Sequence, residues 1–364
     1  MDDDKLPQVN DNSIINDMRL PNEFRSITFS EYKKTQVKTQ FTVSLVNNKI
    51  EPACYWCSEL ICAGHFMDVW EVIFHFAGKY IHVGNPKLFI YLEKRYSTFR
   101  EIMSQGMFLN ELQLRNHPVI RQLFAQIVAV LITSNKKYSV EAVKINKQEE
   151  YDITQMTDRF LAPNVQYIND IFKKDDPREL FIAANEFAYN ISKDKLNMRN
   201  ACYWVEWIIE FDLICKKRKQ PCFCETRPFV KVETKFRNDC IWILWETLFH
   251  YCNENDNAFI SELMRSIYAL FCVKYTTASC KRRRYLLYFA IALLTENVST
   301  NIDLFSNKTF IHTITNNINR VYRQVKKKEH VPSTDYLFNN LEQENAFEQS
   351  LRKLQLVNSM DAPV

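Results

Sequence analysis

Four potential soft metal ligands lie close together near the start of the chain. Cys54, Cys57, Cys62 and His65 are spaced C-x2-C-x4-C-x2-H. Zinc knuckles use these ligand types, but their chain turns tightly between ligands, whereas the intervening residues here favour a helix. Along a helix the set spans about 16 Å, too far for one tetrahedral ion with ligands near 2.3 Å. We therefore expect a stripe of buried thiols rather than a zinc site.

A second thiol set lies in the later part of the chain and has a different setting. The set consists of Cys215, Cys222, Cys224 and Cys240. Pro221 and other helix-breaking residues between the first and the last of them indicate a loop. A loop can fold around a metal ion, although a C-x-C pair is less usual than C-x2-C. Both interpretations stay open, a metal site and unligated loop thiols.

Imidazole and carboxylate groups raise the possibility of hydrolysis. His65, His75 and His82 lie in a segment that also contains carboxylates, and Glu206 and Glu210 are one helical turn apart. No HExxH pattern accompanies them. Core or capping histidines and a salt-bridged helix edge are the simpler expectation. We expect a protein that is not an enzyme and needs no cofactor, with a metal-dependent nuclease as the minor alternative.

Glycine is scarce, which excludes several enzyme classes. The chain has 364 residues and only 4 are Gly, none of them after Gly106. A Walker loop, a dinucleotide-binding GxGxxG and a nucleophile elbow all need Gly where the backbone approaches phosphate or turns sharply. Most nucleotide-driven enzymes are therefore disfavoured.

Basic runs are the better-supported chemical signal. The overall charge is only +4, from 47 Lys and Arg against 43 Asp and Glu, so local clusters must decide. Three runs, beginning at Lys216, Lys281 and Lys326, stand near ends of expected helices and can neutralise nucleic-acid phosphates. Solvated helix ends and an acidic protein partner are the alternatives. The candidate nucleic-acid-binding residues are Lys216, Lys217, Arg218, Lys219, Arg227, Lys281, Arg282, Arg283, Arg284, Lys326 and Lys327.

The elements that would position these residues are helices. Apolar residues recur at helical spacing along most of the chain, which predicts an all-α fold. The longest apolar stretch, Tyr285 to Leu294, is half of what a bilayer span needs, so we expect a buried helix and no membrane segment. We predict a flexible arm at 1–22, helical halves at 23–150 and 151–330, and a last helix and tail at 331–364.

An internal duplication is indicated by a repeated tetrapeptide. Ala53-Cys54-Tyr55-Trp56 recurs as Ala201-Cys202-Tyr203-Trp204, 148 positions later, and the similarity extends to both sides. Two related halves built from stacked helix pairs would follow. The alternative is that two unrelated helices need the same residue types at their packing positions.

Five stretches of the sequence carry a family resemblance. They are ACYWCSELICAGHF (53–66), KYIHVGNPKLFIYLEKRY (79–96), DDPRELFIAANEFAYNISKD (175–194), ACYWVEWIIEF (201–211) and CKRRRYLLYFAIALLTE (280–296). Together they resemble a protein family of nucleocytoplasmic large DNA viruses, the giant viruses, that has no assigned activity. A shorter similarity, from Ile50 to Gly64, is to the small helical subunit of phage clamp loaders.

The resemblance implies a viral protein that acts in the host cytoplasm, in a viral factory or in the virion, and that is not secreted. It supplies no catalytic residues. Together with the basic runs it predicts a helical scaffold that binds nucleic acid in viral replication, transcription or genome handling. The alternative is an adaptor, a virion component or a clamp-loader-like subunit whose partner is a viral replication or transcription protein.

Overall fold

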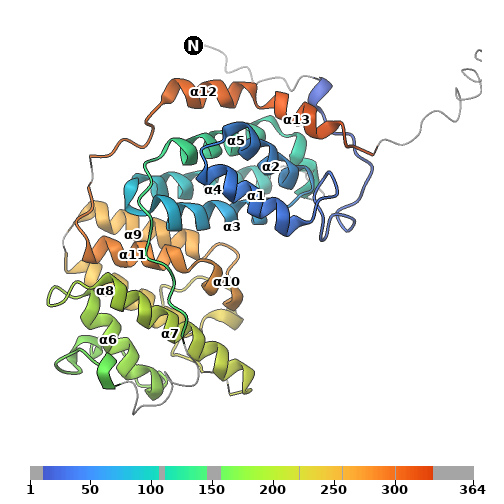
Figure 1. Cartoon of the computed structure of the whole chain (residues 1–364). Coiled ribbons are helices and arrows are strands. Elements are labelled where there is room, and N and C mark those ends of the chain that lie inside the picture. Colours follow the sequence, from blue (N-terminus) through green and yellow to red (C-terminus); the bar gives the residue numbers. More distant parts are fainter. Residues whose placement is uncertain are drawn as a thin grey trace, which may run out of the picture.

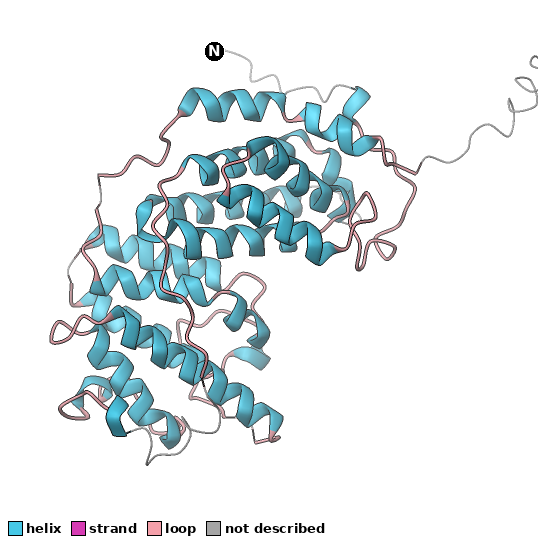
Figure 2. Ribbon diagram, in the orientation of Figure 1, coloured by secondary structure: helices cyan, strands magenta, loops and turns pink. Residues whose placement is uncertain are grey.

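The computed structural model shows an all-α protein, as the sequence predicts. It describes residues 11–105, 111–145, 157–220, 222–255, 257–299 and 301–330, and the helix expected within 331–364 lies outside them. These residues form thirteen α-helices and no strand (Figures 1 and 2). The fold class is therefore confirmed.

The first helices form an antiparallel hairpin and a third helix that packs on it. α1 (Lys34–Val46) and α2 (Ile50–Cys62) are joined by a short turn in which Asn48 has a positive φ of 55°. Asn tolerates this left-handed conformation, so the chain can reverse there. α3 (Phe66–Phe76) packs against both helices of the hairpin.

The connection from α3 to the next long helix touches the other part of the molecule. It passes through a π-helical turn, η2 (Ala77–Ile81), and a short turn, η3 (His82–Gly84). A Cβ atom at Gly78 would lie 2.9 Å from the backbone of Tyr285, so only glycine allows this approach. α4 (Lys87–Gln105) and α5 (Pro118–Thr133) complete the N-terminal group.

A second group of helices surrounds one buried helix. It contains α6 (Phe181–Ile191), α7 (Met198–Lys217), α8 (Ile241–Asn253), α9 (Ala258–Phe271), α10 (Thr277–Arg282) and α11 (Arg284–Thr295). Every residue from Tyr285 to Leu294 is buried, which confirms the buried helix expected there. α11 packs against α7, α8 and α9, and also against α3 and η2 of the first group. This helix therefore joins the two groups.

The last two described helices return to the start of the chain. α12 (Lys308–Asn317) packs on α5, and α13 (Asn319–Lys326) packs on α2 (Figure 1). Residues that the sequence assigned to the C-terminal half thus cover the N-terminal helices.

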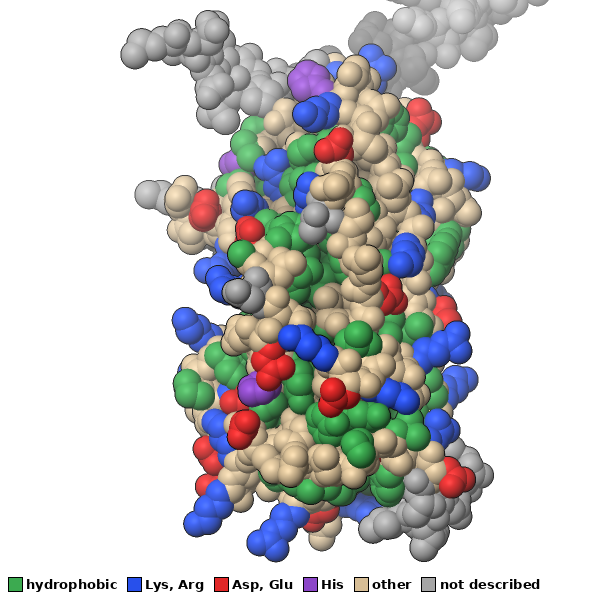
Figure 3. All heavy atoms as spheres, turned by 90° about the vertical axis from the view of Figure 1, so that its left-hand side faces the viewer, with side chains coloured by type: hydrophobic (Ala, Val, Ile, Leu, Met, Phe, Trp, Pro, Cys, Tyr) green, Lys and Arg blue, Asp and Glu red, His purple; other side chains and the backbone are tan. Residues whose placement is uncertain are grey.

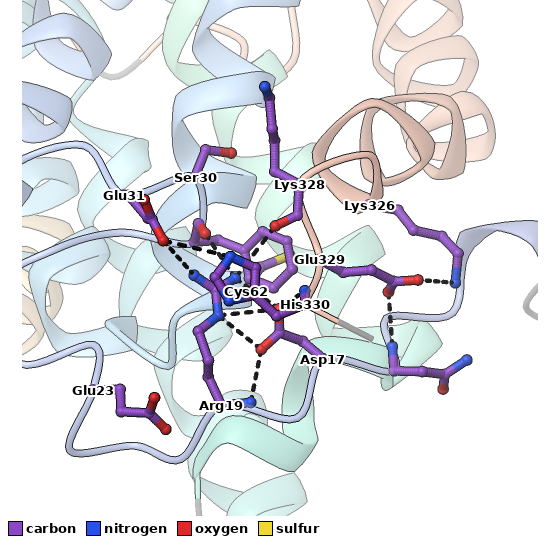
Figure 4. A network of polar contacts seen from close by, with 12 residues as sticks. Asp17, Arg19, Glu23, Ser30, Glu31, Cys62, Lys326, Lys328, Glu329 and His330 are labelled. Atoms are coloured by element: carbon purple, nitrogen blue, oxygen red, sulfur yellow. Dashed lines mark hydrogen bonds and ion pairs between the residues drawn. The ribbon is translucent and has the colours of Figure 1, made fainter. Parts of the chain in front are cut away.

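The segment before α1 is packed, which corrects the prediction of a flexible arm as far as residues 13–22 are concerned. Ile15 and Asp17 are buried. The Arg19 guanidinium donates to Asp17 at 2.6 Å, and the backbone N–H of His330 donates to the same carboxylate at 2.7 Å (Figure 4). Apolar burial and these charge-assisted hydrogen bonds hold the segment against the residues that follow α13, the last described helix.

The second helices of the two hairpins of the proposed duplication begin at matching positions. α7 begins at Met198 and α2 at Ile50, which is the 148-residue offset of the repeated tetrapeptide. The adjacent aromatic rings have the same separation in both, 5.1 Å for Tyr55–Trp56 and 5.1 Å for Tyr203–Trp204. Neighbouring residues on any helix can adopt this geometry, so the duplication stays a prediction.

Candidate nucleic-acid interface

The long helix α7 carries carboxylates that hold the second basic run. Arg284 Nη1 lies 2.9 Å from Glu206 Oε2, and Lys281 forms an ion pair with Glu210 one turn further along. The Tyr288 hydroxyl donates to the other oxygen of Glu206 at 2.8 Å. The Glu206 and Glu210 pair, which the sequence left open as a nuclease motif or a salt-bridged edge, therefore fixes the α10–α11 junction on α7.

The first basic run begins on the last turn of the same helix. The Lys216 ammonium lies 2.7 Å from Asp212 and 3.1 Å from Asp239, and it also donates to Thr277 at the start of α10 at 3.4 Å. Lys216, at the start of the first run, and Lys281, in the second run, are therefore both anchored by carboxylates of α7 near the start of α10. Between Glu206 and Lys216 the helix rises about 15 Å at 1.5 Å per residue. We call this surface the α7 basic track, formed by Lys216, Lys217, Arg218, Lys219, Lys281, Arg282 and Arg284.

Five cations of the track are accessible. Lys217, Arg218 and Lys219 are exposed and have no ion pair with any residue that the structure describes. The Lys281 and Arg282 side chains are 51% and 52% exposed although carboxylates lie near them. Exposed cations are what a phosphate backbone can neutralise.

A groove with a volume of about 450 Å³ adjoins the second run. It lies between α1 and α3 on one side and α10 and α11 on the other, and its lining includes Lys38, His75, Arg282, Arg284 and Tyr285. The edge of the His75 ring faces Tyr285, with the ring centroids 5.2 Å apart. Burial, and then the neighbouring cations, lower the pKa of His75. The groove is thus positively charged with an aromatic wall.

One face of the molecule carries charges of both signs. Figure 3 views the left-hand side of Figure 1, where basic side chains alternate with acidic ones and hydrophobic side chains gather in the lower part.

Two predicted binding residues are buried, which corrects their assignment to the nucleic-acid surface. The Arg227 guanidinium lies 2.5 Å from Asp176 and 2.8 Å from Glu246. The Arg283 guanidinium lies 2.5 Å from Glu71 and donates to the backbone oxygen of Phe271 at 2.7 Å. Their charges are already compensated inside the fold, so both residues hold the structure together.

The third basic run lies apart from the other two. It follows α13, and Figure 1 shows the N-terminal helices between α13 and α10. Lys326 pairs with Glu329 at 3.1 Å and donates to the backbone oxygen of Ile14, within the polar network shown in Figure 4. Lys327 is exposed. Lys326 therefore attaches the start of the chain to its last described helix.

Burial disfavours the thiolate form of several cysteines in the two sets. Cys54, Cys57 and Cys62 are buried on α2, and burial raises the pKa of Cys54 and of Cys62 to about 12. In the second set the Cys240 thiol donates to the backbone oxygen of Cys222 at 3.3 Å. A hydrogen bond with Cys240, together with burial, raises the pKa of Cys222 far above its ordinary value. Metals bind thiolates, so both settings disfavour ligation.

The remaining members of the cysteine sets and the histidines have local contacts. Cys215 is half-buried and Cys224 is buried. His65 Nε2 lies 2.8 Å from the backbone oxygen of Ile27, and His82 is buried against Phe289. Within the residues that the structure describes, no group of three or more His, Cys, Asp or Glu side chains is arranged to hold a metal ion.

Sequence reasoning did not find the contribution of the N-terminal helices to the interface. Lys38 lines the groove beside Arg282 but is more than 200 residues away from it in sequence. It forms an ion pair with Asp68 at 2.8 Å. Because Lys38 is a single cation on an ordinary helix, no local pattern distinguishes it.

Among the described helices, none combines the length and apolar character needed to cross a membrane.

Comparison with other proteins finds no relative. No family model, curated protein or solved structure matches this chain.

Proposed function

We propose that this protein is a non-enzymatic helical scaffold that binds nucleic acid along the α7 basic track. The observation that carries the proposal is that Lys216 of the first run and Lys281 of the second are both held by carboxylates of α7, next to a groove lined by further cations. A folded surface with converging Lys and Arg side chains is the electrostatic feature that nucleic-acid binding requires.

The dimensions of the track favour a short contact. A single strand carries a phosphate about every 3.4 Å along a helical axis, so a track of about 15 Å faces about four or five phosphates. Five accessible cations suit this number. For duplex DNA, a plot of the logarithm of the binding constant against the logarithm of the salt concentration should then have a negative slope. The magnitude of that slope should be about 4. The backbone contacts account for affinity and not for sequence preference.

The biological setting of the proposal comes from the resemblance to giant-virus proteins. On that basis the bound nucleic acid is a viral genome or its transcript, in replication, transcription or genome handling within the infected host cytoplasm or the virion. The proposal of binding itself is independent of this setting, because it is argued from the track alone.

The test is a fluorescence-polarisation titration of labelled DNA and RNA across a salt series. One variant carries Lys217→Glu, Arg218→Glu, Lys219→Glu and Arg282→Glu, which leaves the buried Arg283 intact. The matched control carries Arg320→Glu, Arg323→Glu, Lys327→Glu and Lys328→Glu, which changes four exposed cations on or after α13. We expect the track variant to lose about tenfold or more in affinity and to show a flatter salt dependence, and the control to retain most binding. Equal effects of the two variants would reject the track.

A further inference from the structure

A second groove, unrelated to the basic track, lies between α2 and the two returning helices. Its volume is about 730 Å³. Half-exposed apolar side chains from both sides of the groove line it, and Arg320 stands among them as an exposed cation. The main apolar lining residues are Ile50, Tyr55, Trp56, Ile314 and Val321. A groove of this size and composition suits a short peptide segment with large apolar side chains.

The equivalent surface of the second hairpin is covered by a segment of the chain. Trp204, which corresponds to Trp56, is only 1% exposed. The Phe160 ring stacks over it with a centroid distance of 6.2 Å and an interplanar angle of 11°. The Arg159 guanidinium lies 4.6 Å from the centre of the Tyr203 ring. The second hairpin therefore shows that an aromatic ring and a guanidinium can pack side by side on such an aromatic surface.

The covering segment is also held by its backbone. The N–H groups of Leu161 and Ala162 donate to the Glu186 carboxylate at 3.0 and 2.9 Å. Its sequence is Thr157-Asp158-Arg159-Phe160-Leu161, a Thr-Asp pair followed after one residue by two large apolar residues. The segment that covers the aromatic pair of the second hairpin therefore has this residue pattern.

The same pattern recurs in the last part of the sequence. Thr334-Asp335-Tyr336-Leu337-Phe338 has the Thr-Asp pair and, after one residue, the two large apolar residues. It starts four residues after His330, where the described structure ends, and Gln324, six residues before His330, lines the groove. Seven extended residues from His330 to Leu337 reach about 23 Å, so the pattern can return to the groove.

We propose that residues 334–338 of the same chain occupy the groove beside Trp56. Leu337 and Phe338 fill the apolar lining of Tyr55, Trp56 and Val321, and the Asp335 carboxylate pairs with the Arg320 guanidinium. The segment then covers the groove side of Trp56, as Phe160 covers Trp204 in the second hairpin. The inference does not depend on nucleic-acid binding, and its test measures a different surface.

The test uses the full chain with a photoreactive benzoyl-phenylalanine in place of Phe338. After irradiation, mass spectrometry maps the residues to which position 338 is joined. We expect cross-links to residues 50–56 and 313–324 within one chain. The yield should not change with protein concentration up to the micromolar range, because a short tether gives a millimolar effective concentration. The same photoreactive group at Met360, outside the pattern, is the matched control and should give a several-fold lower yield at the groove.

A second variant separates groove binding from proximity. Leu337→Asp, added to the photoreactive chain, alters no residue of the described fold and should reduce the groove cross-links several-fold. A yield that rises with protein concentration would assign the groove to the segment of a second copy and overturn the intramolecular proposal. Equal yields from positions 338 and 360, or no effect of Leu337→Asp, would also overturn it.

Discussion

Arg284 and Glu206 form an ion pair of 2.9 Å in which the carboxylate is buried and the guanidinium borders the groove. Burial raises the pKa of Glu206, and the charge of Arg284 and the hydrogen bond from Tyr288 oppose that shift. The cation that the carboxylate positions therefore favours the ionised form of that carboxylate. Its role is to orient a basic side chain.

Replacing this carboxylate should destabilise the fold. Glu206→Gln keeps the size of the side chain but leaves the Arg284 charge without its counter-ion, and we expect a loss of about 3 kcal/mol in the free energy of unfolding. Urea denaturation followed by circular dichroism measures it. Glu262→Gln, on the exposed side of α9, is the control and should change stability by less than about 0.5 kcal/mol. A Glu206→Gln protein as stable as the control would contradict the structural role.

The neighbouring carboxylate should limit nucleic-acid binding. Glu210 forms an ion pair with Lys281, whose side chain is half exposed. Glu210→Gln removes a negative charge from the basic track and frees Lys281 for phosphate. Since exposed ion pairs are worth about 0.2–1 kcal/mol, we expect affinity to rise by up to about fivefold at low salt. Polarisation titrations at two salt concentrations check this, and weaker binding by the variant would count against the track.

Stability should depend on pH through His82. Burial lowers the pKa of this residue from 6.5 to about 4. A histidine held neutral in the fold contributes stability fully above pH 6.5, and this contribution is lost as the pH falls from about 6.5 to about 4. It amounts to on the order of 3 kcal/mol. Unfolding free energies between pH 7 and 4 should thus fall less steeply for His82→Asn than for the natural chain, and His312→Asn, at an exposed position, should leave the slope unchanged.

The glycine at the contact between the two helical groups should not tolerate a side chain. A Cβ atom at Gly78 would lie 2.9 Å from the backbone and Cβ of Tyr285, and a backbone cannot move aside as a flexible side chain can. We expect Gly78→Ala to lower the free energy of unfolding by about 1–3 kcal/mol through overpacking. Thermal denaturation provides the measurement. A stabilised variant would mean that η2 and α11 separate more easily than the structure indicates.

The fold class was accessible from sequence because helical periodicity is a local property. Tyr285 to Leu294 is apolar on all sides, and such a stretch predicts a buried helix without knowledge of its neighbours. The return of α12 and α13 over α5 and α2 was not accessible, because amphipathic helices reveal that they cover an apolar surface but not which one. For the same reason the arm before α1 was predicted as flexible, since its partner His330 is 313 residues from Asp17.

The site was predicted in part. Clustering of Lys and Arg located the first two runs, but it could not separate Arg282 from Arg283, which are neighbours with opposite environments. Arg283 is buried and donates to Glu71, which is 212 residues away, whereas the Arg282 guanidinium lies 4.0 Å from the same carboxylate and its side chain is 52% exposed. Arg227 was misplaced for the same reason, because its partner Asp176 is 51 residues away. A buried arginine and an exposed one look alike until their carboxylates are known.

The hydrogen bond from His330 to Asp17 also bears on the order of events on the ribosome. Residues 14–19 are synthesised more than 300 residues before their partners Lys326, Glu329 and His330. α2 is likewise synthesised well before α13, the helix that packs on it. At about 5–20 residues per second, α2 spends at least about 13 seconds without this cover. The packing of the N-terminal helices is therefore completed only after the helices of the second group have been synthesised.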